Sequence, residues 1–594
     1  MIHVKFGATI GIDGVTFRLW APAAKRVDVM LDVPHGMQCS HGMQRSSDGW
    51  FAATVAAATA GSRYRFRIDD EIQVSDPASH YQPEGVFGPS EVIDHDAYRW
   101  RATEWRGRPW AEATILEAHV GSFTAAGTYR AMIDKLDHLV STGITALELM
   151  PLADFPGRRS WGYDGVLWYA TANAYGRPED LKTLIDEAHL RGLMVFLDVV
   201  YNHFGPEGNS LGHYAPTFFS PAETPWGSAI DYSIPQVRQF AIQNALSWLD
   251  NYRFDGLRLD AVHAIVEPGD PPFLAELSRQ VGHFAASSRR AIHLILENDD
   301  NRATLLDPST DPPDGRYRAQ WNDDYHHAWH VLLAGETAGY YQDYPDPRGG
   351  IAGALGSGFI YQGEASKHRA GKRRGEPSRI LPPTAFVAFL QNHDQIGNRA
   401  FGDRLETIAK PAAMEAALAI TLLAPMPPML FMGEEWGSRT PFPFFCDFAD
   451  DLSEAVRQGR RREFQEAYAA HGDEIPDPVD QATFCSARLD WHELATPAAQ
   501  RRLSLVRRLL TVRKERITPR LADARFGDAG ISATGLLSAQ WTLGENGSLT
   551  LRANLSETPI LCPPGSDSSG EVIWGDRSRN EMPPWSVVWA IGDR

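Results

Sequence analysis

Three short apolar runs in this sequence each lead to a carboxylic acid. They are Leu257-Arg258-Leu259-Asp260, Leu294-Ile295-Leu296-Glu297 and Phe389-Leu390-Gln391-Asn392-His393-Asp394. A strand that is buried on both faces has such an apolar run, and an α/β barrel carries its chemistry at the carboxyl ends of its parallel strands. Three acids that converge there, with one acting as nucleophile and one as proton donor, can cleave a glycosidic bond. The pattern therefore predicts a sugar-cleaving centre.

The neighbours of the three acids suggest a role for each of them. Arg258 lies two residues before Asp260, on the same face of a strand, so its charge favours an ionised Asp260 that acts as the nucleophile. Glu297 ends an apolar strand, and burial is expected to raise its pKa so that it can donate a proton. Asp394 follows His393 and is expected to bind sugar hydroxyls. One acid at a strand end is more often an ion-pair or capping residue, but three acids beside Arg or His favour catalysis.

Two histidines are further candidates near the acids. His203 ends the run Asp198-Val199-Val200-Tyr201-Asn202-His203, in the same way that the acids end theirs. His263 lies three residues after Asp260, and it is either a substrate-binding residue or a satisfied core histidine. The sequence has no GxxxxGK[ST] or HExxH motif, which argues against nucleotide and zinc-peptidase chemistry.

The composition is that of a globular protein with a neutral ligand. The 594 residues favour two to four domains, and a net charge of −18 disfavours nucleic acid and anionic membranes as partners. Aromatic residues make up 10% of the chain, which suits sugar faces, although most such rings belong to cores. We expect no cofactor and no metal, since no calcium-type DxDxDG run occurs. With no apolar signal segment at Met1–Phe6 and no run of about 18 apolar residues, the sequence predicts a cytoplasmic protein.

The pattern of the chain changes twice, which predicts a multidomain protein. Residues 1–105 contain short alternating runs typical of a β-sandwich. In residues 106–519, eight apolar runs alternate with helical segments, which predicts a central (β/α)8 TIM barrel. Residues 520–594 return to strand patterns and predict a C-terminal β-sandwich. The eight predicted barrel strands are 115–117, 146–150, 194–199, 256–260, 292–297, 319–321, 386–391 and 428–432.

Two insertions interrupt the predicted barrel. Residues 201–235 are rich in Gly, Pro, Ser and aromatic residues, and we expect a small subdomain over the mouth of the barrel. Residues 362–383 carry six Lys and Arg residues among Gly and Pro. This charge run is typical of a solvated, mobile loop, and a phosphate-binding role is the weaker alternative.

These motifs together resemble the four signature regions of the α-amylase superfamily of glycoside hydrolases (family 13). The regions are Asp198 to His203, Gly256 to His263, the stretch around Glu297, and Asn392-His393-Asp394. The resemblance implies that Asp260 is the nucleophile, Glu297 the acid/base and Asp394 the stabiliser of the transition state. It also implies that Arg258, His203 and His393 line the subsite of the sugar that is attacked. Tyr163 and Trp226 are candidates for stacking on sugar rings, with a core or loop-supporting role as the alternative, and Asp164 and His263 are further candidates for substrate binding.

Further motifs narrow the resemblance within the superfamily. Gly157-Arg158-Arg159-Ser160-Trp161-Gly162-Tyr163-Asp164-Gly165 and Gln391 to Arg399 are similar to members that act on maltooligosaccharides capped by trehalose. The resemblance implies a retaining hydrolase that cleaves the α-1,4 bond next to the terminal trehalose unit, and carboxyl groups of Asp260 and Glu297 that lie roughly 5–5.5 Å apart. A glucan-branching or other α-glucan-acting enzyme is the first alternative. A non-catalytic glucan-binding protein is the second.

Overall fold

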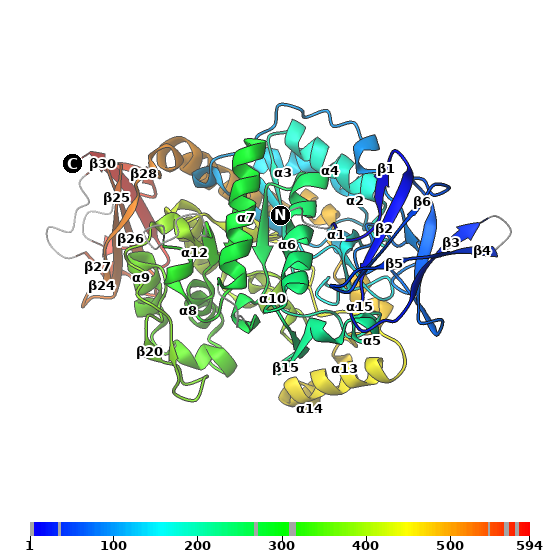
Figure 1. Cartoon of the computed structure of the whole chain (residues 1–594). Helices are drawn as coiled ribbons and strands as arrows, with labels where there is room; N and C mark the ends of the chain where they lie inside the picture. The colour runs from blue at the N-terminus through cyan, green and yellow to red at the C-terminus, as the bar shows by residue number, and fades with distance from the viewer. Residues whose placement is uncertain are drawn as a thin grey trace.

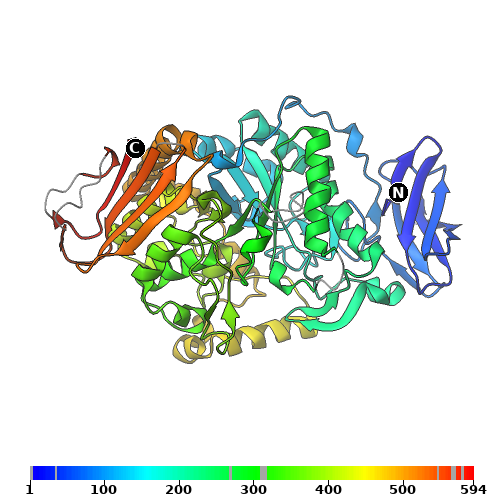
Figure 2. The same ribbon diagram turned by 60° about the vertical axis from the view of Figure 1, so that its left-hand side comes forward.

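The computed structural model describes residues 5–33, 37–266, 271–307, 317–544, 547–562, 570–576 and 581–593. It has three parts, with the N-terminal strands on one side of a central barrel and the C-terminal strands on the other (Figure 1). A view turned by 60° shows the two outer parts still separated by the barrel (Figure 2). The predicted fold class is confirmed. The domain limits 105/106 and 519/520 remain predictions.

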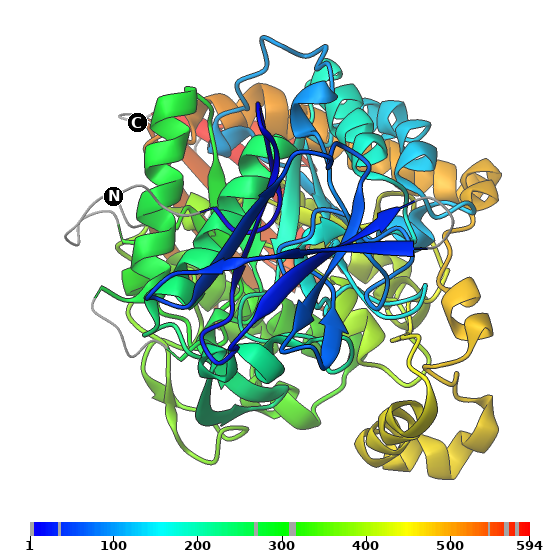
Figure 3. The same cartoon turned by 45° about the vertical axis from the view of Figure 1, so that its right-hand side comes forward.

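The N-terminal part consists of two antiparallel sheets (Figure 3). One sheet contains β1 (Thr9–Gly11), β2 (Gly14–Trp20), β6 (Trp50–Val55) and β5 (Gln44–Arg45). The other contains β4 (Met37–Gly42), β3 (Val27–Val33), β7 (Arg63–Ile68), β8 (Ile72–Val74) and β9 (Ser90–Glu91). Alternate residues of the strands are buried between the sheets, and the Phe17 ring of β2 lies 4.7 Å from the Tyr64 ring of β7.

Eight parallel strands form the barrel, as the sequence predicts. They are β10 (Ile115–Ala118), β11 (Ala146–Leu149), β14 (Met194–Val199), β17 (Gly256–Leu259), β18 (His293–Leu296), β19 (Ala319–Trp321), β22 (Phe386–Val387) and β23 (Met429–Phe431). Each pairs with its neighbour in chain order, and β10 also pairs with β23. A parallel bridge between Ala388 and Pro428 closes the ring. Nearly all strand residues are buried because helices cover the outside and side chains fill the inside.

Helices of very different length surround the strands. The longer ones are α4 (Pro178–Leu190), α6 (Pro235–Asn251), α7 (Phe273–Ser288), α8 (Asp323–Ala334), α9 (Pro347–Ser357), α12 (Pro411–Leu423) and α16 (Pro497–Val512). The shorter ones on this layer include α2 (Tyr129–Ile133), α3 (Leu136–Thr142) and α11 (Leu405–Ile408). Helix α12 is buried along most of its length because the C-terminal part covers the side that faces away from the barrel.

The C-terminal part is a five-stranded antiparallel sheet with a small second sheet. The first contains β24 (Arg525–Ile531), β25 (Leu536–Leu543), β26 (Gly547–Asn554), β30 (Val587–Asp593) and β28 (Glu571–Trp574), and the second contains β27 (Ile560–Leu561) and β29 (Glu581–Met582). The Trp589 indole N–H donates to the Ala419 carbonyl of α12 at 3.1 Å. This bond joins the sheet to the barrel layer.

Three segments extend from the carboxyl ends of the strands. The predicted insertion 201–235 contains α5 (Leu211–Tyr214) and the antiparallel pair β15 (Phe219–Thr224) and β16 (Gly227–Ile230). The basic segment contains the pair β20 (Glu364–Ala365) and β21 (Arg373–Arg374). After β23 come α13 (Asp450–Glu463), α14 (Gln465–His471) and α15 (Gln481–Ser486). Within the described ranges, none of the helices combines the length and apolar character needed to cross a membrane.

Candidate active site

Asp260 and Glu297 lie one residue beyond the ends of two adjacent strands. Leu259 of β17 pairs with Leu296 of β18, so the two acids follow in register. The Asp260 N–H donates to the Val199 carbonyl at 3.0 Å, and the Glu297 N–H donates to the Leu259 carbonyl at 3.0 Å. The backbone of the barrel therefore fixes both acids at its carboxyl rim.

Asp394 reaches the same rim in a different way from the one predicted. The seventh strand, β22, is only two residues long, and Asp394 lies in α10 (His393–Gly397) rather than at a strand end. The Asn392 side chain caps this short helix, because its oxygen accepts the Asp394 N–H at 2.9 Å. Asp394 and Glu297 both line a pocket of about 210 Å³, so the predicted strand end is wrong while the two acids do face one cavity.

A single buried arginine holds Asp260 and Glu297. Arg258 Nη1 lies 2.8 Å from Asp260 Oδ1 and 2.6 Å from Asp198 Oδ2, and Nη2 lies 2.8 Å from Glu297 Oε2. The guanidinium also packs over the Trp321 ring at 4.1 Å. Because Arg258 is only 1% exposed, its charge acts on these carboxylates with little screening by water.

Burial raises the pKa of both acids above their ordinary values. For Glu297 burial is the largest cause, Arg258 opposes it, and the carboxylate of Asp260 raises the pKa further. For Asp260 burial again raises the pKa, and Arg258 lowers it. The arrangement favours a protonated Glu297 beside an ionised Asp260.

A side-chain amide and a backbone N–H also hold Asp260 and Glu297 in position. Asn202 Nδ2 donates to Asp260 Oδ2 at 2.8 Å, and the Ala261 N–H donates to Glu297 Oε2 at 2.8 Å. Ala261 has a φ of 38°, in the left-handed region that residues with a Cβ rarely adopt. The turn after β17 thus directs a backbone donor at the neighbouring acid.

Tyr163, His393 and His203 form one side of the site. The Tyr163 hydroxyl donates to Asp198 Oδ2 at 2.6 Å, and its ring stacks on the His393 ring at 5.1 Å. His393 Nδ1 donates to Glu117 Oε1 at 2.5 Å, and although burial lowers its pKa, Glu117 shifts the net pKa upward. His203 Nε2 donates to the Tyr163 carbonyl at 3.0 Å, and burial lowers the pKa of His203 to about 4. His393 therefore favours its charged form and His203 its neutral form.

The other predicted substrate-binding residues occupy three different places. His263 lines the pocket with Glu297, and its Nδ1 accepts the Asp299 N–H at 3.2 Å. Trp226, which is 45% exposed, lies between β15 and β16, and its ring stacks on His203 at 5.0 Å. Asp164 accepts a hydrogen bond from Ser160 at 2.9 Å and is not among the pocket-lining residues. The contact of Asp164 is thus within its own loop.

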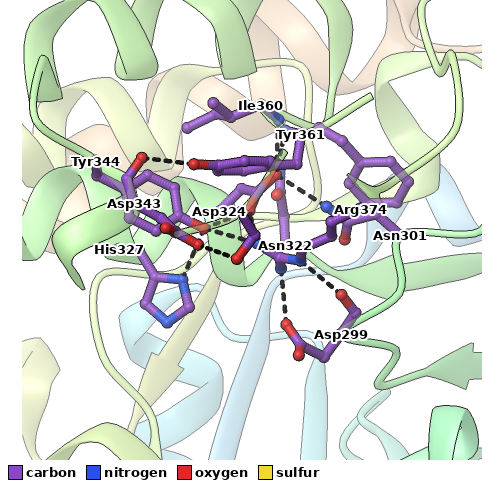
Figure 4. Close-up of polar contacts among 12 residues, drawn as sticks. Asp299, Asn301, Asn322, Asp324, His327, Asp343, Tyr344, Ile360, Tyr361 and Arg374 are labelled. Carbon is purple, nitrogen blue, oxygen red and sulfur yellow. Dashed lines mark hydrogen bonds and ion pairs between the residues drawn. The ribbon is translucent and has the colours of Figure 1, made fainter. Parts of the chain in front are cut away.

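The basic segment forms part of the pocket wall, which corrects in part the prediction of a solvated loop. Arg374 is 5% exposed, and its Nη1 lies 2.8 Å from Asp324 Oδ1 while its Nη2 lies 2.9 Å from Asp299 Oδ1 (Figure 4). Arg369 Nη1 pairs with Asp300 Oδ1 at 2.7 Å. Arg369 and Arg374 are paired with acids because the segment folds back over the rim as a hairpin. The other four basic residues are exposed, namely Lys367, Lys372, Arg373 and Arg379.

Asp324 is the centre of this charged cluster. It is fully buried, and its Oδ2 accepts the Ile360 N–H at 2.7 Å and the Tyr361 N–H at 2.9 Å, while its Oδ1 accepts the Tyr344 hydroxyl at 2.5 Å (Figure 4). The cluster joins the first turn of α8 to the segments that follow α9. It therefore supports the pocket wall next to Glu297.

Several side chains of the candidate site escaped prediction. Glu117 binds His393, and Trp321 packs under Arg258. Asp323 lines the pocket, and burial followed by the charge of Glu297 raises its pKa. Glu117 could have been predicted from the sequence, because it lies at the end of the first apolar run, as the other acids lie at the ends of theirs. Across the described ranges, no group of three or more His, Cys, Asp or Glu side chains is arranged to hold a metal ion.

Family models match all three parts of the chain. "Alpha amylase, catalytic domain" matches residues 94–214, and "Carbohydrate-binding module 48 (Isoamylase N-terminal domain)" matches residues 5–81. A domain of unknown function matches residues 524–589. The barrel and the N-terminal sandwich thus have counterparts among proteins of the α-amylase type.

Curated relatives cover nearly the whole chain. A malto-oligosyltrehalose trehalohydrolase from Deinococcus radiodurans is 38% identical over 92% of this chain and 90% of its own length. One from Saccharolobus solfataricus is 39% identical over 86% of this chain and 87% of its own length. The chain belongs to the malto-oligosyltrehalose trehalohydrolase family. It is therefore related to glycosidases of the α-amylase type.

Solved structures agree with this membership. A crystal structure of a Salmonella typhimurium protein has a TM-score of 0.92 and 41% identity, and it covers 99% of this chain and all of its own. A pullulanase from Paenibacillus barengoltzii, solved with maltohexaose and α-cyclodextrin, has a TM-score of 0.72 at 18% identity, covering 100% of this chain and 96% of its own. The second similarity concerns the fold alone.

Proposed function

We propose that this protein hydrolyses the α-1,4-glucosidic bond next to the terminal trehalose unit of maltooligosyltrehalose, and that it does so with retention. The names of the family members support the substrate. The observation that carries the mechanism is the Arg258 guanidinium, which holds Asp260 and Glu297 together with one bond of 2.8 Å to each. A pair of neighbouring carboxyls is the arrangement of a retaining glycosidase, whereas inverting enzymes separate the two by the width of a water molecule.

In the first step Asp260 acts as nucleophile and Glu297 as acid. An Asp260 oxygen forms a bond to the anomeric carbon while the bond from that carbon to the leaving oxygen breaks. The proton of Glu297 passes to the leaving oxygen, and trehalose departs. Burial raises the pKa of Glu297, which keeps the proton available.

In the second step Glu297 acts as base. Its carboxylate removes a proton from water, the water oxygen bonds to the anomeric carbon, and Asp260 leaves with its electron pair. Two inversions give net retention, so the maltooligosaccharide is released as the α-anomer. Asp394 lines the same pocket as Glu297, and we assign to it the stabilisation of the positive charge that develops on the sugar ring.

The surrounding side chains hold the sugar that is attacked. Tyr163 and His393 stack on each other at 5.1 Å, and together with His203 and Arg258 they form a polar wall beside Asp260. Trp226 is half-exposed at the rim, where its ring can stack on a sugar face. We assign these five residues to binding, and the reaction itself to the formation of trehalose from glucan ends.

Product analysis tests the proposal. The protein is incubated with maltooligosyltrehalose and, separately, with the same maltooligosaccharide without the cap. The proposal predicts release of trehalose from the first substrate and much slower hydrolysis of the second. Branched glucan as the main product would favour the branching alternative. Binding without turnover of any α-glucan would favour the non-catalytic alternative.

A further inference from the structure

We call the pocket that Glu297 and Asp394 line the catalytic pocket. A second pocket adjoins it and takes no part in the proposed mechanism. It has a volume of about 320 Å³, and Tyr340 and Gln395 line both cavities. We call it the side pocket. It is lined by Glu336, Tyr340, Tyr341, Gln395, Asn398, Arg399, Ala400, Phe401, Asp403, Phe464, Ala467 and His471. The two pockets therefore adjoin at Tyr340 and Gln395.

The walls of the side pocket combine aromatic rings with planar polar groups. Tyr340 and Tyr341 lie on one side, with ring centroids 4.5 Å apart, and Phe401 and Phe464 are half-buried elsewhere on the lining. Between them are two carboxylates, a guanidinium and two carboxamides. Aromatic faces suit the C–H faces of glucose, and polar groups with fixed geometry suit its hydroxyl rim.

The polar groups are held in position before any ligand binds. Glu336 Oε2 accepts a hydrogen bond from His330 at 2.8 Å and one from Arg399 at 2.5 Å. The His330 ring in turn stacks on Tyr341 at 4.2 Å. Because these side chains are already ordered in the free protein, binding a ligand costs less side-chain entropy.

The opposite wall is tied to the catalytic loop. Arg460 of α13 donates to the Gly397 carbonyl at 2.8 Å and lies 4.6 Å from the Phe464 ring. The Phe401 ring contacts the His471 ring of α14 at 5.3 Å. Helices α13 and α14 are therefore fixed to the segment that follows Asp394, at the edge of the side pocket.

The charges of the side pocket argue for a neutral ligand. Glu336 and Asp403 are balanced in part by Arg399, which pairs with Glu336 and lies 3.8 Å from Asp403. The two carboxylates would repel an anion. A cation would have to compete with the Arg399 guanidinium for these carboxylates. A neutral polyhydroxylated chain meets neither obstacle, and its hydroxyls can donate to the carboxylates and accept from the guanidinium.

We propose that the side pocket is a glucan subsite that binds glucose units of the maltooligosaccharide chain remote from the bond that is cleaved. This inference rests on the proposed function for the identity of the chain. It is carried by the position of the side pocket, which shares Tyr340 and Gln395 with the catalytic pocket, and by the aromatic and polar lining. It makes recognition of long substrates depend on residues outside the catalytic pocket.

The test uses two variants that change the side pocket in opposite ways. Phe401→Ala removes an aromatic face, and Ala467→Trp fills the space from α14. Phe87→Ala is the control, since Phe87 is 64% exposed and lines neither pocket. For trehalose-capped substrates with six glucose units beside the cap, we expect both variants to raise KM about fivefold, the effect of losing one aromatic contact. With one glucose unit beside the cap, KM and kcat should match the control.

A second readout separates this inference from the proposed function. Calorimetry measures the binding of uncapped maltoheptaose and maltotriose, without any need for turnover. Weaker maltoheptaose binding in both variants, with maltotriose binding unchanged, supports the subsite even if trehalose is never released. Equal effects on short and long ligands, or no effect on either, would overturn the subsite while leaving trehalose release intact.

Discussion

At the scale of single residues, Arg258 determines the charge balance of the site. It is the cation that Asp198, Asp260 and Glu297 share, and it is almost completely buried. Three carboxylates around one guanidinium leave an excess of negative charge, which is one reason that the pKa values of Asp260 and Glu297 are raised. One proton on the pair relieves the repulsion, and our mechanism transfers that proton.

Replacing the nucleophile should abolish turnover without abolishing binding. Asp260→Asn retains the size of the side chain but cannot form the covalent intermediate, so kcat should fall by at least about 10⁴-fold. Affinity for maltooligosyltrehalose, measured by calorimetry, should stay within about tenfold of the parent. Appreciable activity in the purified variant would refute the role of Asp260.

The same substitution should change the acidity of Glu297. The charge of Asp260 raises the pKa of Glu297, so its removal should lower that pKa. In the parent, Glu297 must be protonated to act as acid, so kcat/KM should fall as the pH rises through its elevated pKa. The infrared titration of the Glu297 carboxyl should shift to lower pH in Asp260→Asn. A shift to higher pH would contradict the assigned coupling.

At the scale of secondary structure, the three acids depend on different elements. Asp260 and Glu297 are fixed by strands, whereas Asp394 depends on the cap of a five-residue helix. The Asn392 side chain accepts the N–H groups of Asp394 and Gln395, at 2.9 and 3.3 Å. Such a short helix has little stability of its own, so the cap matters more for Asp394 than for a residue in a long helix.

Removal of this cap should reduce activity more than stability. Asn392→Ala should cost about 1 kcal/mol of unfolding free energy, the usual value for a lost N-cap. Because Asp394 lies in the first turn, we expect kcat to fall by about 10²-fold. Asn392→Ser is the matched control, since serine also caps and should recover most of the activity. Equal kcat values for the Ala and Ser variants would contradict the positioning role.

The hairpin of the basic segment provides an internally controlled stability test. Arg374 pairs with the fully buried Asp324, whereas the neighbouring Arg373 is exposed and donates to the Gly363 carbonyl at 2.7 Å. Arg374→Met leaves a buried carboxylate without its cation and should lower the unfolding free energy by about 3 kcal/mol. Arg373→Met should change it by less than about 0.5 kcal/mol. Denaturant titrations of the two variants measure the difference, and similar midpoints would show that the ion pair does not stabilise the hairpin.

At the scale of the whole molecule, the barrel could be predicted because its strands are buried on both faces. Such strands produce continuous apolar runs, and all eight predicted runs contain the observed strands in whole or in large part. Asp260 and Glu297 could be predicted for the same reason, since each directly follows a run. Short β22 shows where this reasoning fails, because its apolar run continues after the strand has left the sheet.

Contacts between distant segments could not be predicted from spacing. Glu117 and His393 are 276 residues apart, and Arg374 and Asp324 are 50 residues apart. Charged runs such as 362–383 look solvated in sequence, and only the folded chain shows which arginines meet buried acids. The roles of the catalytic and binding residues, and the limits of the three domains, remain predictions that mutagenesis and limited proteolysis can test.

The anomeric form of the fresh product tests the central claim most directly. Proton NMR is recorded during the first minutes of maltooligosyltrehalose hydrolysis, before mutarotation equilibrates the released maltooligosaccharide. We predict trehalose together with the α-anomer at its reducing end, because Asp260 and Glu297 share one guanidinium and act in two displacements. Initial formation of the β-anomer, or a product mixture without trehalose, would contradict the account.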